Sequence, residues 1–127
     1  SPAMNFVRGT YADGKFTVGN TTINVPEVCH EVMKGHNNME VILGVRPEDL
    51  HYADEMSDKY AGMIVDFQVD VSELTGHELI VHGSLEGQDL VGKISSKYDI
   101  PNHSTIKMAM NGEKIHFFDI ETENAII

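Results

Sequence analysis

The 127-residue chain is poor in basic residues, with nine Lys and Arg against 20 Asp and Glu, and it contains one cysteine and no tryptophan. Its formal net charge of −11 disfavours binding to nucleic acid, because an acidic surface repels phosphate backbones and the basic residues form no cluster. The same charge disfavours docking on anionic lipid. The single cysteine, Cys29, excludes a disulfide within the chain and fits a reducing compartment.

Long hydrophobic runs are also missing. No uninterrupted apolar run approaches the ~20 residues that cross a bilayer, and the N-terminus lacks the basic and apolar blocks of a signal peptide. Apolar residues make up 41% of the chain and charged residues 23%, which is typical of a globular protein. Because no change in composition marks a linker, we expect residues 1–127 to form a single domain.

The motifs of several catalytic classes are absent. No phosphate-binding GxxxxGK[ST] loop, no GxGxxG and no GxSxG occur, so we expect neither nucleotide binding nor catalysis by this chain. The seven histidines are scattered, mostly beside predicted turns. Cys29 and His30 have no partner pair at zinc spacing, and the acidic residues between Glu48 and Asp58 lack the order of a calcium loop. We therefore expect no catalytic, cofactor-binding or metal-binding residues here.

Short apolar runs separated by turn signals are what the sequence does contain. Asp13-Gly14, Gly19-Asn20 and Asn111-Gly112 predict hairpin turns, and Asn-Gly is the strongest turn signal in the chain. Residues 62–74 alternate most strictly, which predicts a half-buried strand. Its inward face would carry Met63, Val65, Phe67, Val69 and Val71. Eight or nine such strands predict an all-β barrel or sandwich.

Only residues 26–35 suggest a helix. Pro26 suits a first helical turn, Val28 and Val32 would share a face, and Gly35 suits the C-terminal end. Ten residues make a short helix, and a loop is the alternative.

Four strings carry a family resemblance in their order along the chain: "SPAMNF", "LGVRPEDL", "VSELTGHELIVHG" and "HFFDIETENAI". Together they closely resemble the C-terminal portion of the ATPase subunits of sugar-import ABC transporters, of the maltose and multiple-sugar type. The resemblance implies a transport-associated domain. That domain is an OB-like or MOP-like β-barrel of short antiparallel strands with little helix. ATP and magnesium would then bind in an ATPase domain that precedes Ser1, and Ser1-Pro2 looks native.

The resemblance also implies a role and partners. Such modules are regulatory and dimerisation domains without catalytic activity of their own. The partners would be the chain's own N-terminal ATPase domain, a second copy of the subunit and the membrane permease subunits. A regulatory protein, either an inhibitory sugar-phosphotransferase protein or a transcription activator, is a further possible partner. The expected location is the cytoplasm, at the inner face of the cell membrane.

By position, the family's regulatory or subunit contacts would fall on Phe6, Gly44, Glu73, Gly76 and Phe118. Core packing is an alternative reading for the two phenylalanines, as turn geometry is for the two glycines. Continued alternation would leave the carboxylate of Glu73 near the inner face, where it needs a partner.

The string "VILGVRPEDLH" reads as a structural corner, with partner contact as a secondary role. Gly44 allows a bend or a close approach, while Pro47 ends the ladder and holds Arg46 extended. Arg46 is a further interface candidate, and its guanidinium would form a forked pair with a carboxylate such as that of Glu48 or with one across the barrel.

Another reading is an oxyanion-binding β-domain of the molybdate type, which shares this kind of barrel. The net charge and the lack of a Ser/Lys-rich anion nest weigh against it.

Overall fold

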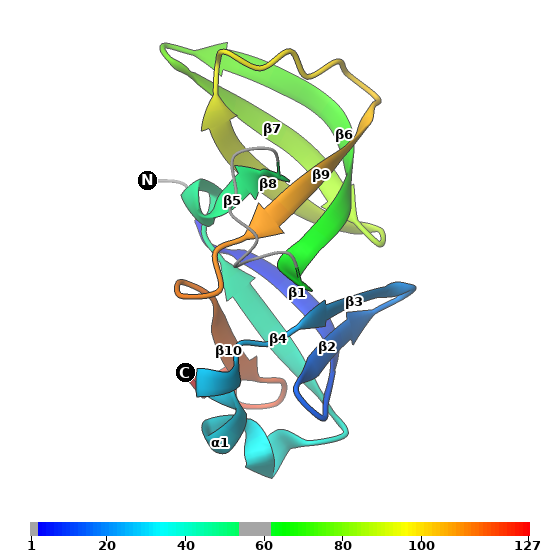
Figure 1. The fold of residues 1–127 in the computed structure, drawn as a ribbon, viewed down its shortest axis with the longest axis vertical. Helices are drawn as coiled ribbons and strands as arrows, with labels where there is room; N and C mark the ends of the chain where they lie inside the picture. The colour runs from blue at the N-terminus through cyan, green and yellow to red at the C-terminus, as the bar shows by residue number, and fades with distance from the viewer. Residues whose placement is uncertain (1–2, 54–61) are drawn as a thin grey trace.

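The first of two antiparallel sheets occupies the lower part of the molecule in Figure 1. A computed structural model describes residues 3–53 and 62–127. The strand order of this sheet is β10-β4-β1-β2-β3. The strands are β1 (Asn5–Ala12), β2 (Lys15–Val18), β3 (Thr21–Asn24), β4 (Met39–Val45) and β10 (His116–Asp119).

The second sheet is strongly curved and lies above the first in the same view (Figure 1). Its order is β5-β9-β6-β7-β8. The strands are β5 (Leu50–Tyr52), β6 (Ile64–Thr75), β7 (Glu78–Leu85), β8 (Gln88–Ser95) and β9 (Thr105–Met110). The predicted β-rich fold with little helix is confirmed, and the three-residue β5 is a strand that the sequence patterns did not predict.

Two of the three predicted hairpin turns join neighbouring strands of one sheet. Asp13 and Gly14 adopt φ values of 50° and 77° between β1 and β2, and Gly19 adopts 55° between β2 and β3. The Asn111-Gly112 hairpin is wrong, because β9 pairs in the second sheet and β10 in the first. The Asn111 side chain instead accepts the N–H of Glu113 in a crossover between sheets.

The alternation of β6 changes phase at a β-bulge. Val69 pairs with Gly83 but Val71 pairs with His82, so Asp70 is an extra residue without a partner in the ladder. One extra residue exchanges the two faces of a strand. The predicted inward face is therefore right from Met63 to Val69 and wrong for Val71, which is 39% exposed.

The predicted helical region forms, but as a broken segment. It consists of a 3-10 turn (Glu27–Cys29), the short helix α1 (His30–Met33) and a second 3-10 turn (Lys34–His36). The predicted apolar face is wrong: Val28 is 87% exposed, whereas Cys29 and Met33 are buried. Asn38, with a φ of 62°, is the residue in the left-handed region that follows, rather than Gly35.

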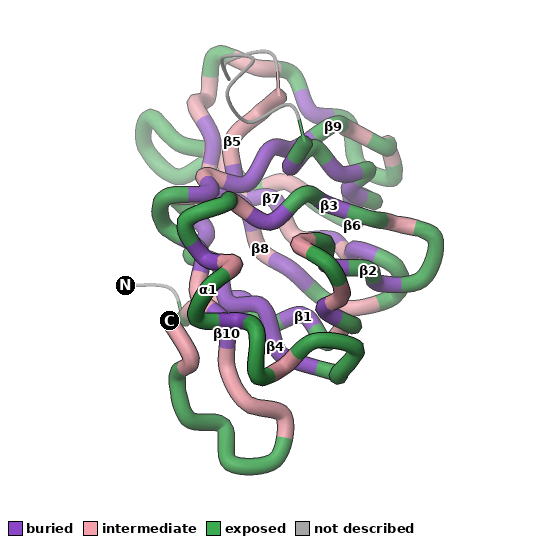
Figure 2. The backbone as a smooth tube through the Cα atoms, turned by 60° about the horizontal axis from the view of Figure 1, so that its bottom comes forward, coloured by how far each residue is buried: buried purple, intermediate pink, exposed green. Residues whose placement is uncertain are grey.

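The hydrophobic core lies between the sheets, where buried residues line the facing strands (Figure 2). Val7, Leu43 and Phe117 of the first sheet and Phe67 and Val81 of the second are each 0% exposed. Both sheets therefore contribute to one core.

Two side-chain amides join the sheets where β1 faces the edge of β8. Asn5 donates through Nδ2 to the carbonyl of Val91 at 2.8 Å and accepts the Val91 N–H through Oδ1 at 2.9 Å. From the other strand, Gln88 accepts the Arg8 N–H at 2.8 Å and donates to the Arg8 carbonyl at 2.9 Å. Each amide thus bonds both the N–H and the carbonyl of one residue in the opposite strand, where no neighbouring strand pairs with that backbone. We call these four hydrogen bonds the amide seam.

Replacing Asn5 by Ala leaves the N–H and carbonyl of Val91 without their partner in a partly buried position. We expect a loss of about 2 to 4 kcal/mol in the free energy of unfolding, measured by urea denaturation. Asn20→Ala, at an exposed turn residue, is the matched control and should cost under about 0.5 kcal/mol. An equal loss of free energy of unfolding in Asn5→Ala and Asn20→Ala would show that the amide seam does not stabilise the fold.

Met33→Ala empties a fully buried position and should cost about 2 to 5 kcal/mol in the same measurement. Val28→Ala on the exposed face should cost under about 0.5 kcal/mol. A larger loss for Val28→Ala than for Met33→Ala would contradict the observed burial and support the apolar face that the sequence pattern predicted.

Candidate functional site

Four of the six predicted site residues lie on or beside the outer face of the first sheet. Phe6 of β1 pairs with Gly44 of β4, and Phe118 of β10 pairs with Ile42 of β4. Arg46 follows the end of β4 in an extended conformation, with φ −76° and ψ 151°, as predicted for a residue before proline. Residues far apart in sequence therefore meet on one face because β1, β4 and β10 are adjacent.

Gly44 lies within β4 and not in a turn, in contrast to the turn geometry considered for it. A Cβ at this position would approach the sulfur of Met4 to 2.5 Å and Cε2 of Phe118 to 2.7 Å. The glycine therefore makes room for two side chains that lie across the sheet.

Phe6 and Phe118 form an aromatic pair outside the core. Their ring centroids are 5.5 Å apart in an edge-to-face arrangement, and Phe6 is 55% exposed. The core ring of β10 is the neighbouring Phe117, which is fully buried. Core packing is thus the wrong reading for Phe6, and Phe118 is half-buried on the same outer face.

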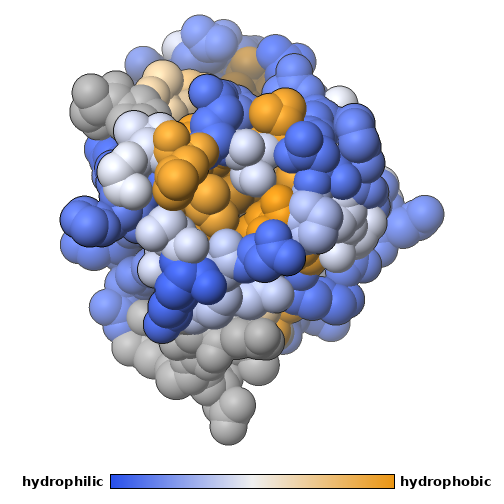
Figure 3. All heavy atoms as spheres, turned by 90° about the horizontal axis from the view of Figure 1, so that it is seen from above, coloured by the Kyte–Doolittle hydropathy of each residue, from blue (hydrophilic) through white to orange (hydrophobic). Residues whose placement is uncertain are grey.

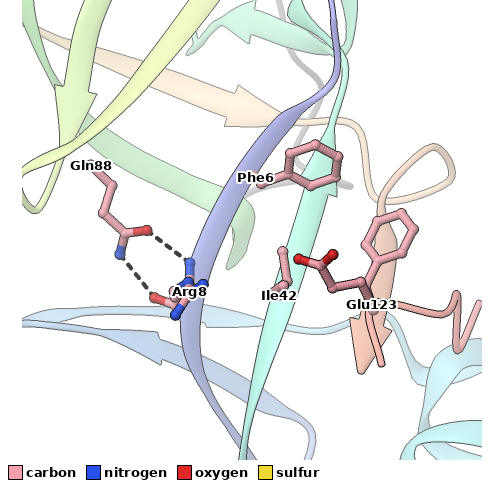
Figure 4. Close-up of a pocket in the computed structure, with 6 residues that line it drawn as sticks. Phe6, Arg8, Ile42, Gln88 and Glu123 are labelled. Carbon is pink, nitrogen blue, oxygen red and sulfur yellow. Dashed lines mark hydrogen bonds between the residues drawn. The ribbon is translucent and has the colours of Figure 1, made fainter. Parts of the chain in front are cut away.

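A shallow hollow of about 420 Å³ lies beside this pair, and we call it the outer groove. Figure 4 shows Gln88 reaching the β1 backbone from one side and Glu123 extending over Ile42 from the other. The lining residues are Phe6, Arg8, Ile42, Gln88, Phe118 and Glu123.

The predicted carboxylate partner of Arg46 differs from the observed contact. Within the described residues, its guanidinium donates to Nε2 of His116 at 3.4 Å, and no ion pair joins it to Glu48 or to another carboxylate. Because Nε2 accepts, the proton of His116 lies on Nδ1, which donates to the Ile127 carbonyl at 3.2 Å. This chain of contacts ties the end of β4 to the last described residues.

Glu73 and Gly76 lie elsewhere, on the β6–β7 hairpin of the second sheet. The bulge turns Glu73 outward, so the expected inner-face position is wrong, and its carboxylate lies 2.6 Å from Nε2 of His82. Gly76 has a φ of 63°, and no atom lies near the position that a Cβ would take, which fits turn geometry.

Figure 3, seen from above this end of the molecule, shows hydrophobic side chains surrounded by hydrophilic ones. Leu74 of the hairpin is 70% exposed.

Asp119 orders the turn that carries Glu123. Its Oδ1 accepts the N–H groups of Glu121 and Thr122, each at 2.9 Å, and its Oδ2 lies 3.3 Å from Nε2 of His36. The Thr122 N–H, then that of Glu121, and the His36 contact hold the pKa of this carboxyl below its ordinary value of 3.8. The Glu123 N–H in turn donates to the Asp119 carbonyl at 2.9 Å.

The sequence patterns missed Arg8, Ile42, Gln88 and Glu123 of the groove. Arg8 follows Phe6 by two residues, so strand alternation alone places it on the same face. No local signal marks Gln88, which comes from the other sheet, or Glu123, which comes from the turn after β10.

No three His, Cys, Asp or Glu side chains of the described residues gather as a metal site requires. No helix in residues 3–53 and 62–127 has the length and apolar character needed to cross a bilayer.

Burial raises the pKa of the Cys29 thiol, which favours its protonated form. Asp54, Glu55 and Asp58 of the acidic run lie outside the described residues.

The chain is similar to known proteins over nearly its whole length. The MalK OB fold domain family matches residues 1–50. The oligosaccharides import ATP-binding protein MsmX of Bacillus subtilis is 36% identical over 125 residues, which are 97% of this chain and 34% of that protein. The chain is a C-terminal MalK-type OB domain of the sugar ABC-transporter ATP-binding proteins. It spans about a third of the length of the relatives it matches.

The chain is also similar to a second relative and, in fold, to a solved structure. The multiple sugar-binding transport ATP-binding protein MsmK of Streptococcus mutans is 34% identical over 129 residues, covering 99% of this chain and 34% of that protein. The solved structure of the cytoplasmic molybdate-binding protein ModG superposes with a TM-score of 0.65 at 13% identity, over 89% of this chain and 94% of that one. The likeness to ModG shows the fold alone.

The lowered pKa of Asp119 predicts a pH dependence. Because the folded state binds this proton less tightly than the unfolded state, the stabilisation is present above the ordinary value of 3.8 and is lost as the pH falls through the lower folded value. Unfolding followed at several pH values should show a smaller acid-induced loss in Asp119→Asn than in the parent chain. Glu121→Gln is the control and should retain the parent slope; an unchanged slope in Asp119→Asn contradicts the assignment.

Proposed function

We propose that this chain is the non-catalytic regulatory and dimerisation domain of the ATP-binding subunit of a sugar-import ABC transporter. The observation that carries the proposal is the Phe6–Phe118 pair, which lies on the outer face of the first sheet with Phe6 55% exposed, in a domain of this family. Aromatic side chains that are fixed by their own scaffold lose little entropy on binding, so they suit the centre of a protein contact.

The partners follow from this role. They are the ATPase domain of the same subunit, where ATP and magnesium would bind, a second copy of the subunit and the permease subunits. An inhibitory sugar-phosphotransferase protein or a transcription activator would be a regulatory partner. The work would take place in the cytoplasm, at the inner face of the membrane.

The docking surface would be built from two sets of residues. The first set lies on the outer face of the first sheet and consists of Phe6, Gly44, Arg46 and Phe118. The absence of a side chain at Gly44 lets the ring of Phe118 lie against the sheet. Glu73 and Gly76 form the second on the β6–β7 hairpin. Two contact regions in different sheets would let one domain touch two partners while the ATPase domains open and close.

Competition tests the docking role. An excess of this chain, added to the reconstituted transporter whose ATP-binding subunit contains it, should occupy the partner's docking surface and lower ATP hydrolysis. The double variant Phe6→Ala/Phe118→Ala should compete at least about tenfold less well, since aromatic anchors contribute most of the energy of such contacts. Val28→Ala, an exposed residue distant in sequence from both, is the control. No inhibition, or equal inhibition by the aromatic variant, contradicts the proposal.

Calorimetry separates this function from the oxyanion-binding alternative. Molybdate and sulfate should give no saturable heat with the chain, because its net charge of −11 repels anions. Saturable heat at micromolar molybdate would instead support an oxyanion site.

A further inference from the structure

The outer groove holds one positive and one negative side chain that are not paired with each other. Arg8 belongs to β1 and Glu123 to the turn after β10, with β4 between those two strands. No ion pair within the described residues involves the guanidinium of Arg8 or the carboxylate of Glu123. Each keeps its hydrogen-bonding capacity for a ligand.

The floor between these charges is apolar. Ile42 is 7% exposed beneath the groove, and the rings of Phe6 and Phe118 stand beside it. Arginine offers donors only and an ionised carboxylate offers acceptors only. A matching ligand therefore carries acceptors at one end, donors at the other and an apolar face between them.

Charge and size narrow the ligand class. The two side chains cancel in charge, and the net charge of −11 disfavours any anion, including a phosphorylated compound. The volume of about 420 Å³ lies within the ~300–1,000 Å³ typical of small-molecule sites. A neutral ligand of one or two rings fits these limits.

The groove is organised before any ligand arrives. The Gln88 amide fixes the backbone of Arg8 through two hydrogen bonds, and Asp119 holds the turn of Glu123. Glu123 itself has a φ of 62°, a conformation disfavoured for a residue with a side chain. Residues held in such a conformation by their surroundings cluster at binding sites.

We propose that the outer groove binds a neutral mono- or disaccharide. A pyranose has hydroxyl groups that both donate and accept around its edge and C–H groups on its faces. Those hydroxyls would accept from Arg8 and donate to Glu123, while a C–H face lies on the aromatic pair. The choice of a sugar among neutral polar ligands rests on the proposed function, because a domain of a sugar importer that binds the imported compound can report its accumulation.

Titration of the ¹⁵N-labelled chain with maltose tests this site. The amide signals of Phe6, Arg8, Phe118 and Glu123 should shift saturably. Arg8→Ala and Glu123→Gln should each weaken binding at least about tenfold, since each loses charge-assisted hydrogen bonds. Leu74→Ala, an exposed apolar residue of the second sheet, should bind as the parent chain does.

Three results would overturn the sugar site. They are the lack of a saturable shift at about 100 mM maltose, binding of maltose by Arg8→Ala and Glu123→Gln as tight as by the parent chain, or tighter binding of leucine, a zwitterion, than of maltose. The outcomes for the two proposals are distinct. A chain that competes with the transporter but ignores maltose refutes the sugar site alone. A chain that binds maltose but does not compete refutes the docking role.

Discussion

The architecture depends on four hydrogen bonds between side-chain amides and backbone. β1 is the central strand of the first sheet, yet over its first half only β4 pairs with it. Gln88 of β8 supplies the missing partners of Arg8 on β1, and Asn5 of β1 does the same for Val91 on β8, each using both ends of its amide. Because each bond satisfies a backbone group that would otherwise lack a partner, removing one amide costs two interactions at once. The sheets are thereby joined at β1 and β8.

The functional face follows from this closure. On its inner side, β1 packs Val7 into the core, and on its outer side it presents Phe6 and Arg8. Gln88 reaches the outer groove only because β8 lies against β1. The other wall comes from the turn after β10, where Asp119 accepts backbone N–H groups and keeps Glu123 above β4. Docking on the aromatic pair and binding in the groove would therefore use one surface, to which β1, β4, β8, β10 and the turn after β10 contribute.

Much of this fold could be predicted from alternation and turn chemistry, because a strand's period and a positive φ are local properties. The misses arise from tertiary structure. The extra residue Asp70 reverses the faces of Val71 and Glu73, and nothing in the sequence marks a bulge there. Asn111-Gly112 permits a hairpin, but the pairing of β10 with β4 requires a crossover. Of the groove residues, Arg8 was accessible from alternation, whereas Gln88 depends on how two sheets meet.

Native-state amide hydrogen exchange tests the seam most directly. The N–H groups of Arg8 and Val91 donate to side chains instead of to a strand, so ordinary ladder protection does not apply to them. If the seam holds the two sheets together, both amides should exchange as slowly as those of the paired core strands, through global unfolding. Exchange of either amide at the rate of exposed loop amides, while core strands stay protected, would show that β1 and β8 separate freely and would contradict the account.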